Sequence, residues 1–300
     1  MRIFIFCLII LLSAGSCMTV SKEQRMMVQQ FALKTDKFSV FPERIWMELS
    51  EIREARGVYY ANSFTDPATH LQELDAIVKE RMKDDRFHGR VKSVFEILDR
   101  YADALVRLSS DTPFKNRNHL FARLGIELDT LIGDYNHLVE VQRIPPGLGS
   151  VLTQIMDAGT KAYLAGRQRN MLHKYVCQAD TLVSVVCDEM VNCLSSDMLS
   201  KLVENEASGV GESFNFYFTK RTPPSIESEK EYISLKKRVE TVKVLRKQTI
   251  QTVKNLKVAH SKIADALKKK KSLKETAISL NNFYREVEYL QSIVNGLNIN

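Results

Sequence analysis

Glycine and proline are scarce in this chain, with 12 and 7 residues among 300. Turn-rich β-proteins need these residues at their many tight turns, so the scarcity argues against a β-sandwich or barrel and favours long helices. Beyond the N-terminus, no apolar run approaches the roughly 18 consecutive residues of a membrane-spanning helix. A disordered chain is excluded too, because 44% of the residues are hydrophobic and only 26% are charged.

Catalytic signatures are also absent. The sequence contains no HExxH, nucleophile elbow, Walker loop or dinucleotide fingerprint, and the glycines at 147 and 149 lack the residues of a phosphate-binding loop. Two pairs, His70 with Glu73 and Asp134 with His137, place a carboxylate and an imidazole on neighbouring helical turns. A di-metal bundle site needs further inward carboxylates. We therefore assign no catalytic residue, metal ligand or cofactor, and expect no enzyme.

Cysteines are few, and their spacing limits what they do. Cys177, Cys187 and Cys193 fall on one predicted helix, about 15 Å and about 9 Å apart at the helical rise. Both separations exceed the roughly 7 Å over which a disulfide forms. We expect three small buried residues, with a free thiol or an intermolecular bridge as the alternatives.

The N-terminus has the pattern of an export signal. Arg2 precedes the apolar residues 3–12, and small residues follow at 13–16. About ten apolar residues are too few to cross a hydrocarbon core of roughly 30 Å, but they suit the core of a signal peptide.

The stretch Ala14-Gly15-Ser16-Cys17 resembles the lipobox of bacterial lipoprotein precursors, with Ala14 at the position where that family usually has leucine. The resemblance implies cleavage before Cys17, a diacylglyceryl group on its thiol and a further acyl chain on its new amino group, which together anchor a protein stably. Met18 then implies an outer-membrane destination, facing the periplasm or the cell surface. The alternative is a secreted protein that carries no lipid.

Three parts are expected along the chain: a signal peptide at 1–16, a lipid-anchored tether leading into the bundle at 17–40, and a single helical-bundle domain at 41–300. Helix starts are indicated by Pro42 and by Asp66-Pro67, an N-cap followed by proline. After these starts, the sequence predicts interruptions near 84–90, 109–114, 144–150 and 208–226. A long helical segment is expected from about 150 to 206. The aromatic run in the last interruption predicts a loop packed on the bundle.

The C-terminal quarter is the most regular part of the chain. A heptad pattern with Leu235 at position d places residues 239, 242, 246, 249, 253, 256, 260, 263 and 267 in the seam. Arg246 and His260 are polar seam residues that we expect to fix register, the histidine as a satisfied partner. Near residue 270 either a helical hairpin turns or one helix continues. The predicted fold is all-α, an elongated bundle of long antiparallel helices with coiled-coil-like C-terminal helices.

Positive charge is concentrated in the same quarter. Residues 227–300 hold sixteen Lys and Arg against eight Asp and Glu, whereas the whole chain carries a net charge of +7. The export signal argues against nucleic acid as the partner. Either these residues form a solvated face, or they bind an anionic lipid, polymer or protein. The candidate residues for such binding are Lys268, Lys269, Lys270 and Lys271.

The preferred function is a lipid-anchored, non-enzymatic scaffold or adaptor of the cell envelope. The membrane, through the acyl chains on Cys17, and an envelope protein or an anionic lipid or polymer are its expected partners. An alternative is a lipid-binding or membrane-perturbing protein, for which the Gly-flanked segment 147–166 is the candidate region. An envelope enzyme with a scattered active site is the third hypothesis.

Overall fold

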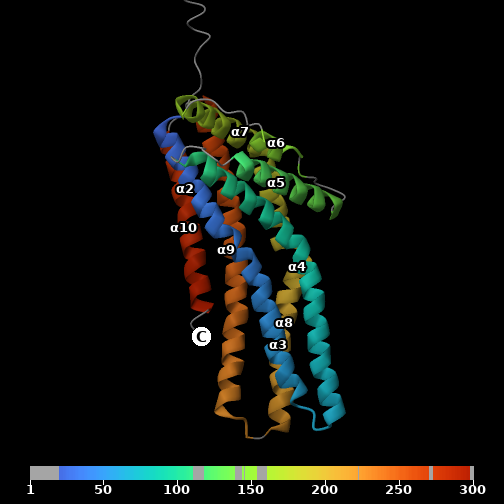
Figure 1. Ribbon diagram of the computed structural model, residues 1–300. Coiled ribbons are helices and arrows are strands. Elements are labelled where there is room, and N and C mark those ends of the chain that lie inside the picture. The colour runs from blue at the N-terminus through green and yellow to red at the C-terminus, as the bar shows by residue number, and fades with distance from the viewer. Residues whose placement is uncertain are drawn as a thin grey trace, which may run out of the picture.

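The computed structural model describes residues 20–110, 118–138, 144, 146–153, 161–221, 223–269 and 273–297. Within these ranges the regular structure is entirely helical, and the helices pack against one another as an all-α bundle (Figure 1). The helices are α2 (Lys22–Ser39), α3 (Phe41–Ala61), α4 (Pro67–Ser109), α5 (Asn118–Leu138), α6 (Leu148–Thr153), α7 (Lys161–Ser195), α8 (Asp197–Lys220), α9 (Ile226–Lys269) and α10 (Leu273–Leu297).

Both predicted proline starts are confirmed. Pro42 lies in the first turn of α3, where its missing N–H costs no hydrogen bond. At the start of α4, Asp66 accepts a hydrogen bond from the backbone N–H of Thr69 at 2.8 Å. The predicted interruption at 84–90 is wrong, because α4 continues through it without a break. One glycine in a helix costs only about 1 kcal/mol, so a single glycine need not end it.

Helix α9 is the central element of the bundle. It contacts α2, α3, α7, α8 and α10, and its predicted seam is confirmed: every seam position except Arg246 is buried, Leu235 at one end and Leu267 at the other included. Of the two alternatives near residue 270, the structure has the helical hairpin. α9 ends at Lys269 and α10 begins at Leu273, and α10 packs back along α9 (Figure 1).

The predicted break at 208–226 is wrong over most of its length. α8 continues to Lys220, and only the short connection before α9 interrupts the helices. Gly209 serves helix packing and makes no turn, since a Cβ there would collide with the guanidinium of Arg56. The aromatic run lies on the last turns of α8, where the ring of Phe214 is 4.3 Å from that of Tyr59. A break that the sequence pattern missed occurs instead at Ser196, whose hydroxyl caps α8.

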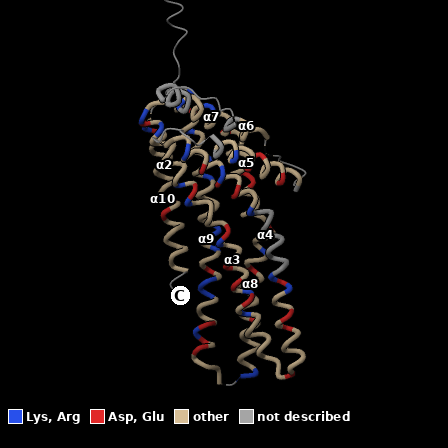
Figure 2. The backbone as a smooth tube through the Cα atoms, viewed as in Figure 1, with Lys and Arg blue, Asp and Glu red and all other residues tan. Residues whose placement is uncertain are grey.

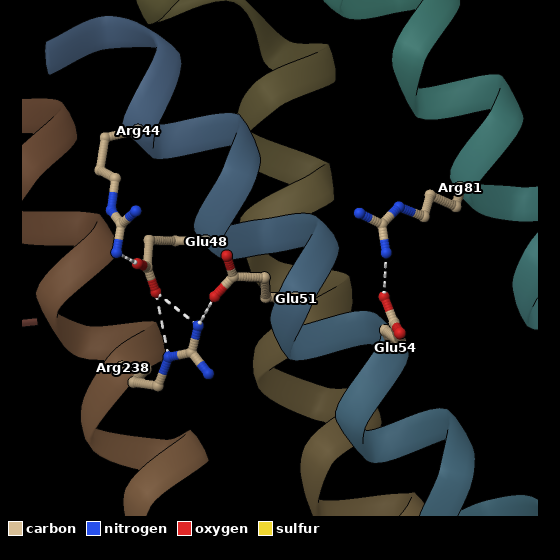
Figure 3. A network of polar contacts seen from close by, with 6 residues as sticks. All are labelled: Arg44, Glu48, Glu51, Glu54, Arg81 and Arg238. Carbon is tan, nitrogen blue, oxygen red and sulfur yellow. Dashed lines mark hydrogen bonds and ion pairs between the residues drawn. The ribbon is translucent and has the colours of Figure 1, made fainter. Parts of the chain in front are cut away.

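Two buried glutamates join α3 to its neighbours. Glu48 is 1% exposed and pairs with Arg44 of its own helix and with Arg238 of α9, at 2.8 and 2.7 Å (Figure 3). Glu206 of α8 is equally buried and lies 2.6 and 2.7 Å from Arg53 and Arg56 of α3. Each carboxylate is therefore compensated by two guanidinium groups, which meets the requirement for burying a charge.

The crossing of α5 over α6 depends on two glycines. A Cβ on Gly125 would collide with the backbone oxygen of Gly149, and a Cβ on Gly149 would collide with that of Gly125. The backbone N–H of Gly149 also donates to Asp129 of α5 at 2.9 Å. The two backbones therefore approach more closely than any side chain allows.

We predict that Gly125→Ala destabilises the protein by about 1–3 kcal/mol, because the added methyl forces the two backbones apart. Gly133→Ala on the same helix is the matched control. No atom lies within 4 Å of a Cβ there, so it stabilises by up to about 1 kcal/mol. Chemical denaturation measures both variants, and equal effects would contradict the proposed crossing.

We predict that Arg238→Met lowers the free energy of unfolding by about 2–3 kcal/mol, since Glu48 stays buried with a charge half compensated. Arg81→Met removes a pair with Glu54 in which the two side chains are 59% and 47% exposed (Figure 3). That loss costs under about 1 kcal/mol. Urea denaturation of the two variants measures both losses in the free energy of unfolding. Similar losses would contradict the prediction that the buried pair contributes more than the exposed pair.

Candidate functional site

The predicted site residues fall partly outside the described chain. Cys17 precedes it, and so does the whole signal segment at 1–16. Lys268 is described in the last turn of α9, where its Nζ lies 3.9 Å from Oδ2 of Asp180. The side chain of Lys269, and Lys270 and Lys271 altogether, lie outside the described residues.

The start of α2 packs against the end of α9. Ser21 and Gln24 form a capping box, in which the backbone N–H of Ser21 donates to Gln24 at 2.9 Å and that of Gln24 donates to Ser21 at 3.2 Å. The amide nitrogen of Gln24 then donates to the carbonyl oxygen of Ala266 at 3.0 Å. We call residues 20–25, 262–269 and 273–276 the anchor end, because Cys17 lies only four residues before Ser21.

Positive charge is concentrated at the anchor end. Its segments hold six Lys and Arg and three Asp and Glu. Lys22, Lys268 and Lys274 are exposed. Along α3, α4, α8 and α9 both signs are interleaved (Figure 2). The anchor end therefore differs in charge from the body of the bundle.

A buried polar cluster lies where α4, α7 and α9 meet. The hydroxyl of Tyr101 is 2.6 Å from Nε2 of His260, and Nδ1 of that imidazole is 3.1 Å from Asp180. The ring of Tyr175 stacks on Tyr101 at 5.3 Å. Tyr101, Tyr175 and His260 are all buried, so the cluster resembles a catalytic triad in connectivity but gives no access to a substrate.

Burial sets the protonation of this cluster. It lowers the pKa of His260, although the hydrogen bond that Nδ1–H of His260 donates to Asp180 opposes the shift. The hydrogen bond that Asp180 accepts from His260 lowers the pKa of Asp180 in turn, and burial raises the pKa of Tyr101. At neutral pH the cluster is a neutral imidazole between a phenol and a carboxylate. The expectation that His260 is a satisfied seam residue is confirmed.

Arg246, the other polar seam residue, fixes register in a different way. It donates to the carbonyl oxygen of Leu194 at 2.5 Å and to the hydroxyl of Ser200 at 2.8 Å. It therefore pairs with a carbonyl group at the end of α7 and connects that helix to α8 across the break at Ser196.

The remaining sequence candidates serve packing or capping. Cys177, Cys187 and Cys193 lie on α7 as predicted, and none forms a disulfide. The expectation that all three are buried is wrong, because Cys177 and Cys193 are only half-buried. Burial raises the pKa of Cys187 and of Cys177, so neither thiol is activated. The imidazole of His70 contacts the carbonyl oxygen of Ala61 at 2.9 Å. Among the described residues no group of three His, Cys, Asp or Glu is placed to hold a metal ion.

The candidate lipid-binding segment at 147–166 is described in part, with residues 154–160 outside the described chain. Its first turn is α6, which packs against α5 through Gly149. Across the described residues, no helix combines the length and the apolarity that crossing a membrane requires.

One cavity was not foreseen from the sequence. It has a volume of about 180 Å³ and lies between the α2–α3 junction and α4. Its lining comes from 39–46 and 92–99, two segments brought together only by the fold, and neither carries a recognisable motif. No periodicity or spacing signal would have found it.

Comparison of the chain with protein-family models, curated proteins and solved structures gives no significant match in any of the three. The argument for function therefore depends on the residues and the geometry described above.

We predict that stability falls as the pH drops below 6.5, the ordinary pKa of histidine. The unfolded chain then takes up a proton at residue 260 that the folded chain, with its lowered pKa, does not bind. His260→Gln removes this difference, so its free energy of unfolding falls less between pH 7 and about pH 5.5. Urea titrations at both pH values measure the change, and parallel losses in the two proteins would contradict the assignment.

Proposed function

We propose that this protein is a lipid-anchored, non-enzymatic scaffold or adaptor of the bacterial cell envelope. Acyl chains on Cys17 hold it in the outer membrane, and the bundle extends from that membrane to bind an envelope protein or an anionic envelope component. The proposal combines the lipoprotein-like N-terminus with the arrangement of the anchor end.

The hydrogen bond from Gln24 to Ala266 carries this proposal. It ties the start of α2, and hence the residues that follow Cys17, to the end of α9 that leads into the lysine run. Four residues of extended chain reach at most about 14 Å. Lys268, in the last turn of α9, is therefore near the head groups of the membrane that holds Cys17.

Electrostatics reinforces this orientation. A Lys or Arg close to an anionic membrane surface contributes about 1 kcal/mol to binding, and acyl chains contribute about 0.8 kcal/mol per buried CH₂. The lipid supplies attachment, and the lysines orient the anchor end toward the membrane. The connections of α3 to α4 and of α8 to α9 then point away from it, since they lie at the opposite end of the bundle (Figure 1).

We predict that the wild-type chain, expressed in a bacterium that processes lipoproteins, begins at an acylated Cys17 and fractionates with membranes. Cys17→Ser removes the thiol that accepts the lipid, so this variant carries no acyl chain and is released by detergent-free extraction once its signal is cleaved. Intact-mass spectrometry and membrane fractionation measure both outcomes. An unacylated wild-type mass would refute the anchor.

The lysine run is tested separately, by flotation of the acylated protein with vesicles. Replacing Lys268, Lys269, Lys270 and Lys271 with Gln should reduce the preference for anionic over zwitterionic vesicles at least tenfold. The matched control replaces four exposed lysines of the first half of α9 with Gln, namely Lys230, Lys237, Lys243 and Lys247. Equal losses in both variants would mean that the anchor end has no special role.

A further inference from the structure

The outward face of α2 carries large apolar side chains at intervals of seven residues. Met26, Leu33 and Val40 belong to this series, Met47 of α3 continues it, and all four are between 43% and 61% exposed. Val40 joins the two helices and itself has right-handed helical backbone angles, φ −85° and ψ −20°. Apolar residues repeated every seven positions are typical of a helix that pairs with another helix. We call these four residues the heptad face.

The length of this series distinguishes it from scattered exposed apolar residues. Two other pairs of exposed apolar side chains in the described chain are seven residues apart, Leu71 with Val78 and Ile226 with Ile233, and each series stops after two members. Single exposed apolar residues are ordinary on a protein surface. Four in one register along consecutive helices indicate an interaction surface.

Charges of opposite sign flank the heptad face. Residues three and four positions after a helical residue lie on opposite sides of it, so Asp36 and Lys37 lie on the two sides of Leu33. Both are exposed, and neither forms an ion pair with another described residue. Burial and the negative charges of Asp99 and Asp103 raise the pKa of Asp36. A cation brought next to Asp36 would therefore stabilise its charged form.

The same two signs recur one heptad later, where Glu43 and Arg44 flank Val40. These two residues already have partners in the chain, since Glu43 lies 3.9 Å from Lys92 and Arg44 lies 2.8 Å from Glu48. They extend the pattern of one negative and one positive side. The pairing argued below depends on Asp36 and Lys37 alone.

We propose that the heptad face binds the heptad face of a second copy of this chain, in a parallel two-fold dimer. A two-fold axis parallel to the helices places the negative side of one copy beside the positive side of the other. Asp36 then faces Lys37 of the second copy, twice in each dimer. An antiparallel pair would instead bring each side next to its own counterpart, with like charges together. The charges therefore select the parallel arrangement.

The size of the heptad face implies a weak dimer. Four side chains per copy are far fewer than the roughly 20–30 residues per side of a standard interface. In a parallel dimer both copies of α2 begin at the same end, so both anchor ends face one membrane. Anchoring in that membrane raises the effective concentration of the two copies. This strengthening rests on the proposed function, whereas the contact between the two faces does not.

Disulfide cross-linking of single-cysteine substitutions tests the contact and its direction. A parallel dimer places each residue of the face opposite itself, so Met26→Cys alone and Met47→Cys alone should each give covalent dimers under mild oxidation. Tyr289→Cys, equally exposed on α10, is the matched control and should give at least tenfold less. The wild-type chain measures the contribution of its own thiols. No dimer from the two α2–α3 variants, or as much from the control, would overturn the proposal.

Two further comparisons separate the alternatives. Dimers that form only when the Met26→Cys and Met47→Cys chains are mixed would indicate an antiparallel pair and contradict the charge argument. The same variants are also tested without the lipid, in the Cys17→Ser background at raised protein concentration. Cross-linking there supports the heptad face even if the anchor is wrong, and its absence both there and on vesicles refutes the face alone.

A charge exchange tests the proposed pair in the Met26→Cys chain. Asp36→Lys and Lys37→Glu should each reduce cross-linking several-fold, because each places like charges together in the dimer. A mixture of the two variants should restore it, since the mixed dimer has opposite charges at both positions. Lys243→Glu, an exposed change on α9, should have no effect, and thermal unfolding checks that each chain is folded. Reduced cross-linking that the mixture does not restore would contradict the pairing.

Discussion

The packed seam of α9 is the interaction on which the rest of the bundle depends. Its apolar positions are buried along the whole helix, from Leu235 to Leu267, and five other helices pack around it. Burying each large aliphatic side chain contributes about 1.5–3 kcal/mol, so this seam supplies much of the driving force for assembly. The same helix carries Lys268 in its last turn, and its orientation therefore also sets where that charge lies.

Apolar packing alone leaves long helices free to slide or rotate by a turn, and buried polar contacts remove that freedom here. Arg246 reaches the end of α7, His260 joins α4 and α7, and Arg238 reaches Glu48 of α3. Each contact satisfies its partners in one register alone, since a shift of one turn would leave a buried charge or donor without a partner.

Sequence periodicity predicted what depends on local pattern and missed what depends on neighbours. The α9 seam and the caps at Pro42 and Asp66 were predicted correctly, because a repeating apolar stripe or a capping residue acts within one helix. Gly209 resembled a turn residue, yet it accommodates Arg56 from α3. The polar stretch at 84–90 resembled a loop, yet it is helical within α4.

The candidate sites also divide into features that the sequence indicated and features that only the fold brings together. The proposed anchor residue and the lysine run were candidates from the sequence alone. The contact of Gln24 with Ala266, 242 positions away, depends on the fold. The cavity beside the α2–α3 junction was not identifiable, since Trp46 and Phe95 are ordinary apolar residues on their own helices. Only the fold places carboxylates beside them.

The proposed orientation is tested most directly by neutron reflectometry of the acylated protein on a supported bilayer. α9 has 44 residues and is about 66 Å long. If the anchor end faces the membrane and the bundle stands upright, the protein layer should be close to that thickness. A layer of about 30 Å, the depth expected for a bundle lying on its side, would contradict the account.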